Sequence, residues 1–185
     1  MRALILSLMM VVAYAGSNTG VVIWASKHAK STANNAMQNN QGGRYFGGAI
    51  RLPFTLLMGS NIELGISNLP DQFWKDSTDE LKITDRHDYV INSLYMLSDS
   101  MAVILGVDYF KQDLSSDFQE RFSNHFNYHA GIEWTMPVVE HLDSGLRVLY
   151  NFNKSHDYCY GANCSTQFKI DQKQLELQMV AIASL

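Results

Sequence analysis

This sequence has only two cysteines, no excess of positive charge and few long apolar runs. These features limit the classes of protein to which the chain can belong. Beyond the N-terminus, no segment offers the roughly 18 uncharged apolar residues of a membrane-spanning helix. The formal net charge of -4 provides no basic stripe for binding nucleic acid. What is present is 46% hydrophobic and 17% charged residues, a composition too apolar for a disordered chain, and 185 residues fit one domain.

The first residues, MRALILSLMMVVAYAGSN, have the form of a secretory signal. Arg2 precedes an apolar run, and Ala13 and Ala15 form the A-x-A pattern of a cleavage site. The apolar run is too short to span about 30 Å of hydrocarbon as a helix. We therefore expect residues 1–15 to be a cleaved signal peptide and residues 16–185 to be a single exported domain.

The stretch FSNHFNYHAGIEWTM, residues 122–136, can be interpreted as a helix or as a strand, and the two interpretations have different consequences. His125, His129 and Glu133 stand four apart, so on a helix they would share one face like the ligands of a metal ion. The apolar residues instead take alternate positions, which is the period of a strand; they are Phe122, Phe126, Tyr128, Ala130, Ile132 and Trp134. On a strand, His125 and Glu133 would lie about 26 Å apart. We predict a strand, with no metal ion and no other cofactor.

The same alternation recurs along the mature chain. We predict further strands at residues 20–28, 44–54, 61–67, 89–97, 101–110, 145–153 and 174–185. With the stretch above, the prediction is about eight strands, each close to the ~10 residues that a tilted strand needs to cross a bilayer.

The connections between these strands alternate in length. Four are long and polar: KSTANNAMQNNQGG, LPDQFWKDSTDELKITDRH, KQDLSSDFQE and KSHDYCYGANCSTQ. Three are short: LLMGS, SDS and PVVEHLD. This order predicts an all-β, eight-stranded antiparallel up-and-down transmembrane β-barrel, with long loops at one end and tight turns at the other. A secreted soluble barrel of lipocalin type has the same number of strands and is the alternative fold.

In its strand alternation and loop rhythm, nearly all of the mature chain resembles the small outer-membrane β-barrels of Gram-negative bacteria, such as the OmpA transmembrane domain, OmpX and the opacity proteins. The most specific element is the C-terminal strand, QLELQMVAIASL, whose alternation runs to Leu185 where that family usually ends in Phe. The resemblance implies a location in the bacterial outer membrane. It also implies contact with lipid and lipopolysaccharide.

If apolar residues face lipid, the polar residues of the same strands face the lumen. We expect these to fill it: Arg51, Glu63, Asp108, His125, His129, Glu133, Arg147 and Glu176. The tight link after the 122–136 stretch brings Glu133 opposite Arg147. In the same way, the short link between the strands at residues 44–54 and 61–67 brings Arg51 near Glu63. The main hypothesis is a plug of paired side chains. The alternative hypothesis is a proton-linked path or a substrate site.

The role of the chain is less specified than its shape. Long loops suit a structural, adhesion or surface-interaction role, in which a monomer contacts host or surface ligands. A lipid-A-modifying enzyme is an alternative, but the His-x-Ser-Asn element of the deacylase of this shape is absent, and no catalytic residue is assigned. In an exported chain, the only two cysteines, Cys159 and Cys164, are expected to form a disulfide.

Overall fold

The computed structural model describes residues 19–27, 32–33, 38–39, 44–54, 60–69, 71–75, 80–115, 118–120, 125–152, 155–160, 166–171 and 175–185. The signal peptide predicted at residues 1–15 and the cysteine at position 164 lie outside these residues. Among the described residues, no helix is long and apolar enough to cross a membrane.

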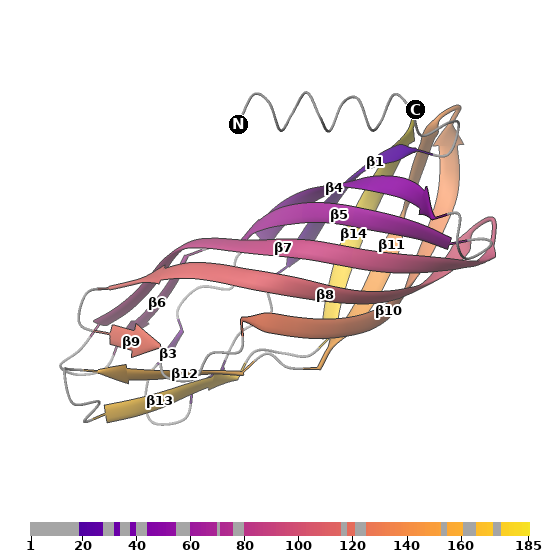
Figure 1. Ribbon diagram of the computed structural model, residues 1–185. Helices are drawn as coiled ribbons and strands as arrows, with labels where there is room; N and C mark the ends of the chain where they lie inside the picture. Colours follow the sequence, from indigo (N-terminus) through magenta and orange to yellow (C-terminus); the bar gives the residue numbers. More distant parts are fainter. Residues whose placement is uncertain are drawn as a thin grey trace, which may run out of the picture.

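Eight antiparallel strands close into a barrel (Figure 1). They are β1 (Gly20–Lys27), β4 (Arg44–Phe54), β5 (Ser60–Leu69), β7 (Glu80–Ser98), β8 (Met101–Leu114), β10 (Phe126–Val139), β11 (Leu142–Asn151) and β14 (Leu175–Ser184). Each strand pairs with the next in this order, and the β1–β14 pairing closes the ring. The predicted fold class is therefore confirmed, and no sheet edge is left open around the barrel.

Six shorter strands extend the structure beyond one end of the barrel (Figure 1). They are β2 (Thr32–Ala33), β3 (Gln38–Asn39), β6 (Gln72–Lys75), β9 (Phe118–Glu120), β12 (Ser155–Tyr160) and β13 (Thr166–Asp171). Four of them form a second sheet in the order β2-β13-β12-β9, and β3 and β6 continue the barrel sheet along β7. The long connections, which the sequence predicts to be polar loops, thus contain β-structure.

The bounds of the predicted strands were right in some places and wrong in others. The strand predicted at residues 44–54 coincides with β4. The strand predicted at residues 89–97 is wrong at its start, because β7 begins at Glu80, inside the stretch expected to be a polar connection. Asp85 has a positive φ of 49°, and the register with β8 shifts between Thr84 and His87. This bulge changes which alternate residues face inward, so a constant period of two does not extend through it.

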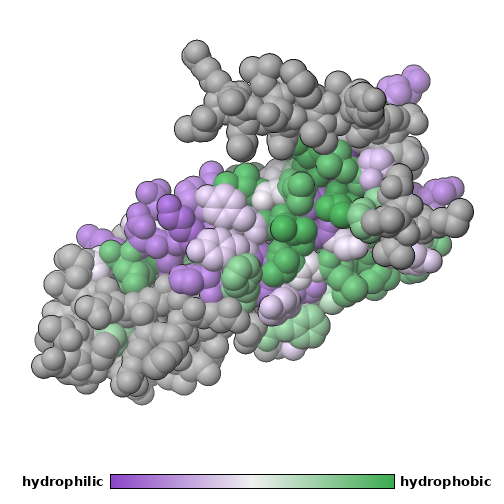
Figure 2. Space-filling model, in the orientation of Figure 1, coloured by the Kyte–Doolittle hydropathy of each residue, from purple (hydrophilic) through white to green (hydrophobic). Residues whose placement is uncertain are grey.

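The two faces of the barrel have opposite chemistry. Large apolar side chains lie on the outside, among them Leu105 and Met179, which are 61% and 66% exposed. Charged side chains on the alternate positions are buried, as Glu63 and Arg147 are. Figure 2 shows hydrophobic residues gathered over the barrel and hydrophilic ones toward the end that carries the extra strands. A water-soluble protein has the reverse distribution.

The interior is not uniformly polar. One apolar cluster lies on β1, β4 and β14 and consists of Val22, Trp24, Tyr45, Ala49, Val180 and Ile182. A second lies on β7, β8 and β11 and consists of Leu94, Ala102, Ile104 and Leu149, with Met96 packed against it. The expectation of a lumen filled by charged residues was incomplete, because these clusters occupy two opposite sides of it.

Candidate functional site: a polar network across the barrel lumen

The centre of the site is a group of two arginines and two glutamates. Antiparallel register places Arg51 directly opposite Glu63 on β4 and β5, and Glu133 directly opposite Arg147 on β10 and β11. In each pair both side chains point inward, and the arginine contacts its partner: Arg51 Nη2 lies 2.6 Å from Glu63 Oε1, and Arg147 Nη2 lies 2.5 Å from Glu133 Oε2. The tight link between β10 and β11 predicts this second pairing.

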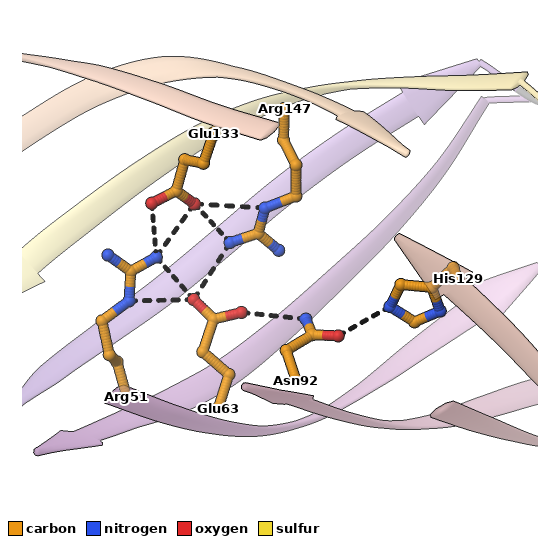
Figure 3. A network of polar contacts seen from close by, with 6 residues as sticks. All are labelled: Arg51, Glu63, Asn92, His129, Glu133 and Arg147. Carbon is orange, nitrogen blue, oxygen red and sulfur yellow. Dashed lines mark hydrogen bonds and ion pairs between the residues drawn. The ribbon is translucent and has the colours of Figure 1, made fainter. Parts of the chain in front are cut away.

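The four residues also contact one another across the lumen (Figure 3). Arg51 Nη2 donates to both oxygens of Glu133, at 2.8 and 2.9 Å. Arg147 Nη2 donates to Glu63 Oε1 at 3.0 Å. The β4–β5 hairpin and the β10–β11 hairpin are separated by two strands on either side of the ring, so these bonds join opposite walls of the barrel. We call these four residues the ion cluster.

The ion cluster is balanced in charge and buried. Its side chains are 1 to 10% exposed, and two positive charges meet two negative ones. Burying four charges is costly, and only complete pairing offsets the loss of hydration. Each charged group here has at least two partners of opposite sign, which is the arrangement that buried charges require.

A chain of hydrogen bonds leads from the ion cluster along the lumen. Asn92 Nδ2 donates to Glu63 Oε2 at 3.0 Å, and Asn92 Oδ1 lies 2.7 Å from His129 Nε2. His129 Nδ1 lies 3.0 Å from Asp108 Oδ1, and Asn127 Nδ2 donates to Asp108 Oδ2 at 2.9 Å. The chain connects β5, β7, β10 and β8.

The bonds in this chain determine where protons lie. Because Asn92 uses its amide nitrogen for Glu63, its oxygen faces His129, and His129 Nε2 must donate to it. The contact between His129 Nδ1 and Asp108 Oδ1 also needs a hydrogen between the two atoms. His129 therefore bridges Asn92 and Asp108, with one ring nitrogen facing each of them.

Gly106 makes room for this chain. Gly106 lies on β8, between His129 of β10 on one side and Asn92 of β7 on the other. A Cβ at this position would lie 2.2 Å from His129 Nε2 and 2.3 Å from Asn92 Oδ1, the two atoms of the bond described above. Any side chain here would force the two groups apart.

A second polar group lies on the other side of the lumen. Tyr45 donates its hydroxyl to Glu176 Oε1, and Gln178 Nε2 donates to the same oxygen at 2.6 Å. Ser26 donates to the backbone oxygen of Leu177 at 3.0 Å, between these two inward positions of β14. This group involves β1, β4 and β14.

The structure brings most of the expected lumen residues together. Arg51, Glu63, Asp108, His129, Glu133 and Arg147 are in the connected network, and Glu176 is in the second group. His125 precedes β10 and lies with its ring 5.8 Å from that of Tyr109, at the end of the barrel that carries the extra strands. Among the described residues, no group of three His, Cys, Asp or Glu side chains is placed to hold a metal ion.

Several members of the network were missed by sequence reasoning. Asn92, Asn127 and Gln178 are neutral, so inward-facing charge does not single them out, although they take the alternate strand positions that face inward. Arg86 is buried on β7 with its guanidinium 5.2 Å from the ring centre of Phe110. It lies in the part of β7 that the sequence predicts to be a polar connection.

Comparison with known proteins rests on structure. No family model matches this chain, and no curated protein matches it in sequence. The chain is similar to the outer membrane protein OprG from Pseudomonas aeruginosa, with a TM-score of 0.59 and 12% identity over 91% of this chain and 95% of OprG. The attachment invasion locus protein Ail of Yersinia pestis, in complex with the heparin analogue sucrose octasulfate, aligns with a TM-score of 0.46 and 11% identity over 90% of this chain and 97% of Ail. At such identities the likeness to OprG shows the fold alone: this chain has the closed eight-stranded antiparallel barrel of an outer-membrane protein.

Proposed function

We propose that this chain is an integral outer-membrane barrel with a closed lumen, which presents its long connections at the cell surface in a structural or surface-interaction role. The observation that carries the proposal is the inverted distribution of side chains, apolar outside and charged inside. Exposed apolar surface of this extent is costly in water and favourable in hydrocarbon. The opposite arrangement, an apolar cavity under a polar surface, is what a lipocalin-like barrel needs.

Aromatic side chains on the outer face support a definite position in the bilayer. At the end that carries the extra strands, the ring of Tyr109 lies 6.4 Å from that of Tyr89 and 5.2 Å from that of Phe126. Near the other end, Tyr95 and Trp134 are 55% and 50% exposed. From Phe126 to Trp134 the strand covers about 26 Å, or about 20 Å along the axis of a barrel with strands tilted by about 40°. This height is close to the ~25 Å apolar band of such barrels.

The lumen supports a plug rather than a wide pore. The ion cluster joins opposite walls, and the two apolar clusters flank it, so side chains occupy the cross-section of the barrel. An eight-stranded barrel is only wide enough to be filled in this way. Recordings in planar bilayers should show no large steady conductance, and a stable pore of porin size would contradict the plug.

The proposal is tested first by fractionation. The expressed protein should remain with the membranes in alkaline carbonate, and it should migrate faster on a gel when it is not boiled, because a folded barrel resists detergent. A chain that is released by carbonate as a soluble protein would overturn the membrane assignment and favour the lipocalin alternative.

Orientation is tested by labelling intact cells. Asp71 lies near the end with the long connections, and Glu140 lies in the tight turn between β10 and β11; both are exposed. In a cysteine-free background, an impermeant maleimide should label Asp71→Cys on intact cells and Glu140→Cys only after lysis. The reverse pattern would place the long connections in the periplasm and remove the surface-interaction role.

A further inference from the structure

A small cavity lies in the lumen between the two polar groups. Its volume is about 20 Å³, and its walls include Trp24 and Gln178 on one side and Asn92, Asp108 and His129 on the other. A polar cavity of this size has room for about one water molecule. It is too small for an organic ligand.

Within the part of the chain that the structure describes, one buried donor and one buried acceptor on the β1–β14 side of the cavity have no hydrogen-bond partner. They are the indole Nε1 of Trp24, which is a donor, and the amide Oε1 of Gln178, which is an acceptor. The amide orientation of Gln178 is fixed, because its nitrogen donates to Glu176. Trp24 and Gln178 are 4% and 5% exposed, so bulk water does not reach these atoms. Buried polar groups without partners are rare in folded proteins.

The two atoms belong to neighbouring positions on adjacent strands. Trp24 pairs with Val180, and Ser26 pairs with Gln178, so Trp24 and Gln178 are diagonal neighbours on the inner face of β1 and β14. The indole ring is held in place because it lies over the backbone of Gly47, where a Cβ would come within 2.6 Å of Nε1. Both groups therefore have fixed directions.

The chemistry of the cavity wall limits the kind of molecule that can bind there. It must accept a hydrogen bond from the Trp24 N–H, which excludes a bare metal cation and ammonium, since neither has a lone pair to offer. It must also donate to Gln178, and the carboxylate of Asp108 in the wall disfavours an anion. A neutral molecule the size of one heavy atom that both donates and accepts is water.

We propose that this cavity binds one ordered water molecule, which accepts a hydrogen bond from Trp24 Nε1 and donates one to Gln178 Oε1. Its second hydrogen is available to the polar wall opposite. The water joins the Tyr45–Glu176–Gln178 group to the network that starts at the ion cluster. The lumen then contains one hydrogen-bonded system that reaches all eight strands. This proposal concerns the interior and does not depend on where the barrel is located.

The test observes the indole N–H of Trp24 directly. In the folded protein labelled with ¹⁵N at its tryptophan indoles, the Trp24 N–H should show a cross-peak to water with the sign of a long-lived bound molecule. The sequence has three tryptophans, so Trp24→Phe assigns the signal. Trp134 faces outward and serves as the internal control, with no such cross-peak. A folded wild-type protein without the Trp24 cross-peak would overturn the proposal.

Two further variants distinguish water from a neighbouring hydroxyl group. Gln178→Met removes the acceptor at similar length, and the cross-peak should be lost or reduced several-fold. Tyr45→Phe removes the nearby hydroxyl, and the cross-peak should persist. Loss of the cross-peak in Tyr45→Phe, with retention in Gln178→Met, would assign it to hydroxyl exchange and contradict the water site. If neither variant folds, the wild-type spectrum alone still decides.

Discussion

The ion cluster and the two apolar clusters fill the same lumen by different physical means. In the apolar clusters, each side chain contributes roughly in proportion to the area it buries, and a neighbour can move partly into a space left by a smaller residue. In the ion cluster, every member depends on partners from the opposite wall, so losing one leaves the others buried and unpaired. Sensitivity to substitution should therefore follow the kind of contact that a side chain makes rather than its depth of burial.

The largest effect should come from breaking the ion cluster. Glu133→Gln or Arg147→Met alone should lower the free energy of unfolding by about 3 to 5 kcal/mol, because each leaves a buried charge without its partner. The double variant should recover much of this loss. Urea unfolding of the barrel in lipid vesicles measures the three values. Additive losses would mean that the two residues do not act as a pair.

A cavity made in an apolar cluster should cost somewhat less. Ile104→Ala should lower the free energy of unfolding by about 2 to 4 kcal/mol, since Ile104 is 0% exposed among Leu94, Ala102 and Leu149. The neighbouring outward residue supplies the matched control. Leu105→Ala removes a side chain that is 61% exposed and should cost much less. Equal losses at the two positions would contradict the assignment of inner and outer faces.

Two glycines, one facing the polar part of the lumen and one facing outward, allow a comparison of steric effects. Gly106→Ala places a methyl group between His129 and Asn92 and should cost about 1 to 3 kcal/mol through the lost hydrogen bond. At Gly48, which faces outward on β4, the nearest atom to an added Cβ lies at 3.5 Å, an ordinary contact. Gly48→Ala should therefore be nearly neutral in the same unfolding measurement, and a comparable loss there would refute the steric explanation.

Part of the fold could be predicted from the sequence because strand geometry is local. Alternation gave β4 its bounds, and a tight turn fixes which residues of a hairpin face each other, as for Glu133 and Arg147. The contacts of Arg51 with Glu133 could not be predicted in this way. They depend on how the sheet closes, and neither alternation nor turn length specifies which residues meet across a lumen.

The first half of β7 shows the other limit. Leu81 and Ile83 are buried at odd positions, whereas Arg86 and Asp88 are buried at even ones. The bulge at Asp85 accounts for this change of parity. A bulge depends on the backbone conformation at one residue. The surrounding residues are rich in charge and carry no sequence signal that predicts it. The buried residues on this part of β7 were missed for the same reason.

The smallest effect concerns the cysteines. Cys159 is buried on β12, and we expect it to be joined to Cys164, so the unfolded, unreduced protein should contain no free thiol by thiol titration. Closing so short a loop should contribute about 1 to 2 kcal/mol at most. Cys159→Ser with Cys164→Ser should therefore leave the barrel folded and change its unfolding little. Two free thiols in the wild-type protein would contradict the pairing.

We propose that apolar side chains of the outer face contact lipid while the lumen is closed to it, and two natural tryptophans can test this arrangement. Trp134 is 50% exposed on the outer face, and Trp24 is 4% exposed in the lumen. Single-tryptophan variants, in which the other two are replaced by Phe, are reconstituted in vesicles whose acyl chains carry bromine. Bromine should strongly quench the fluorescence of Trp134 and leave that of Trp24 nearly unchanged. Equal quenching of the two, or quenching of Trp24 alone, would contradict the account.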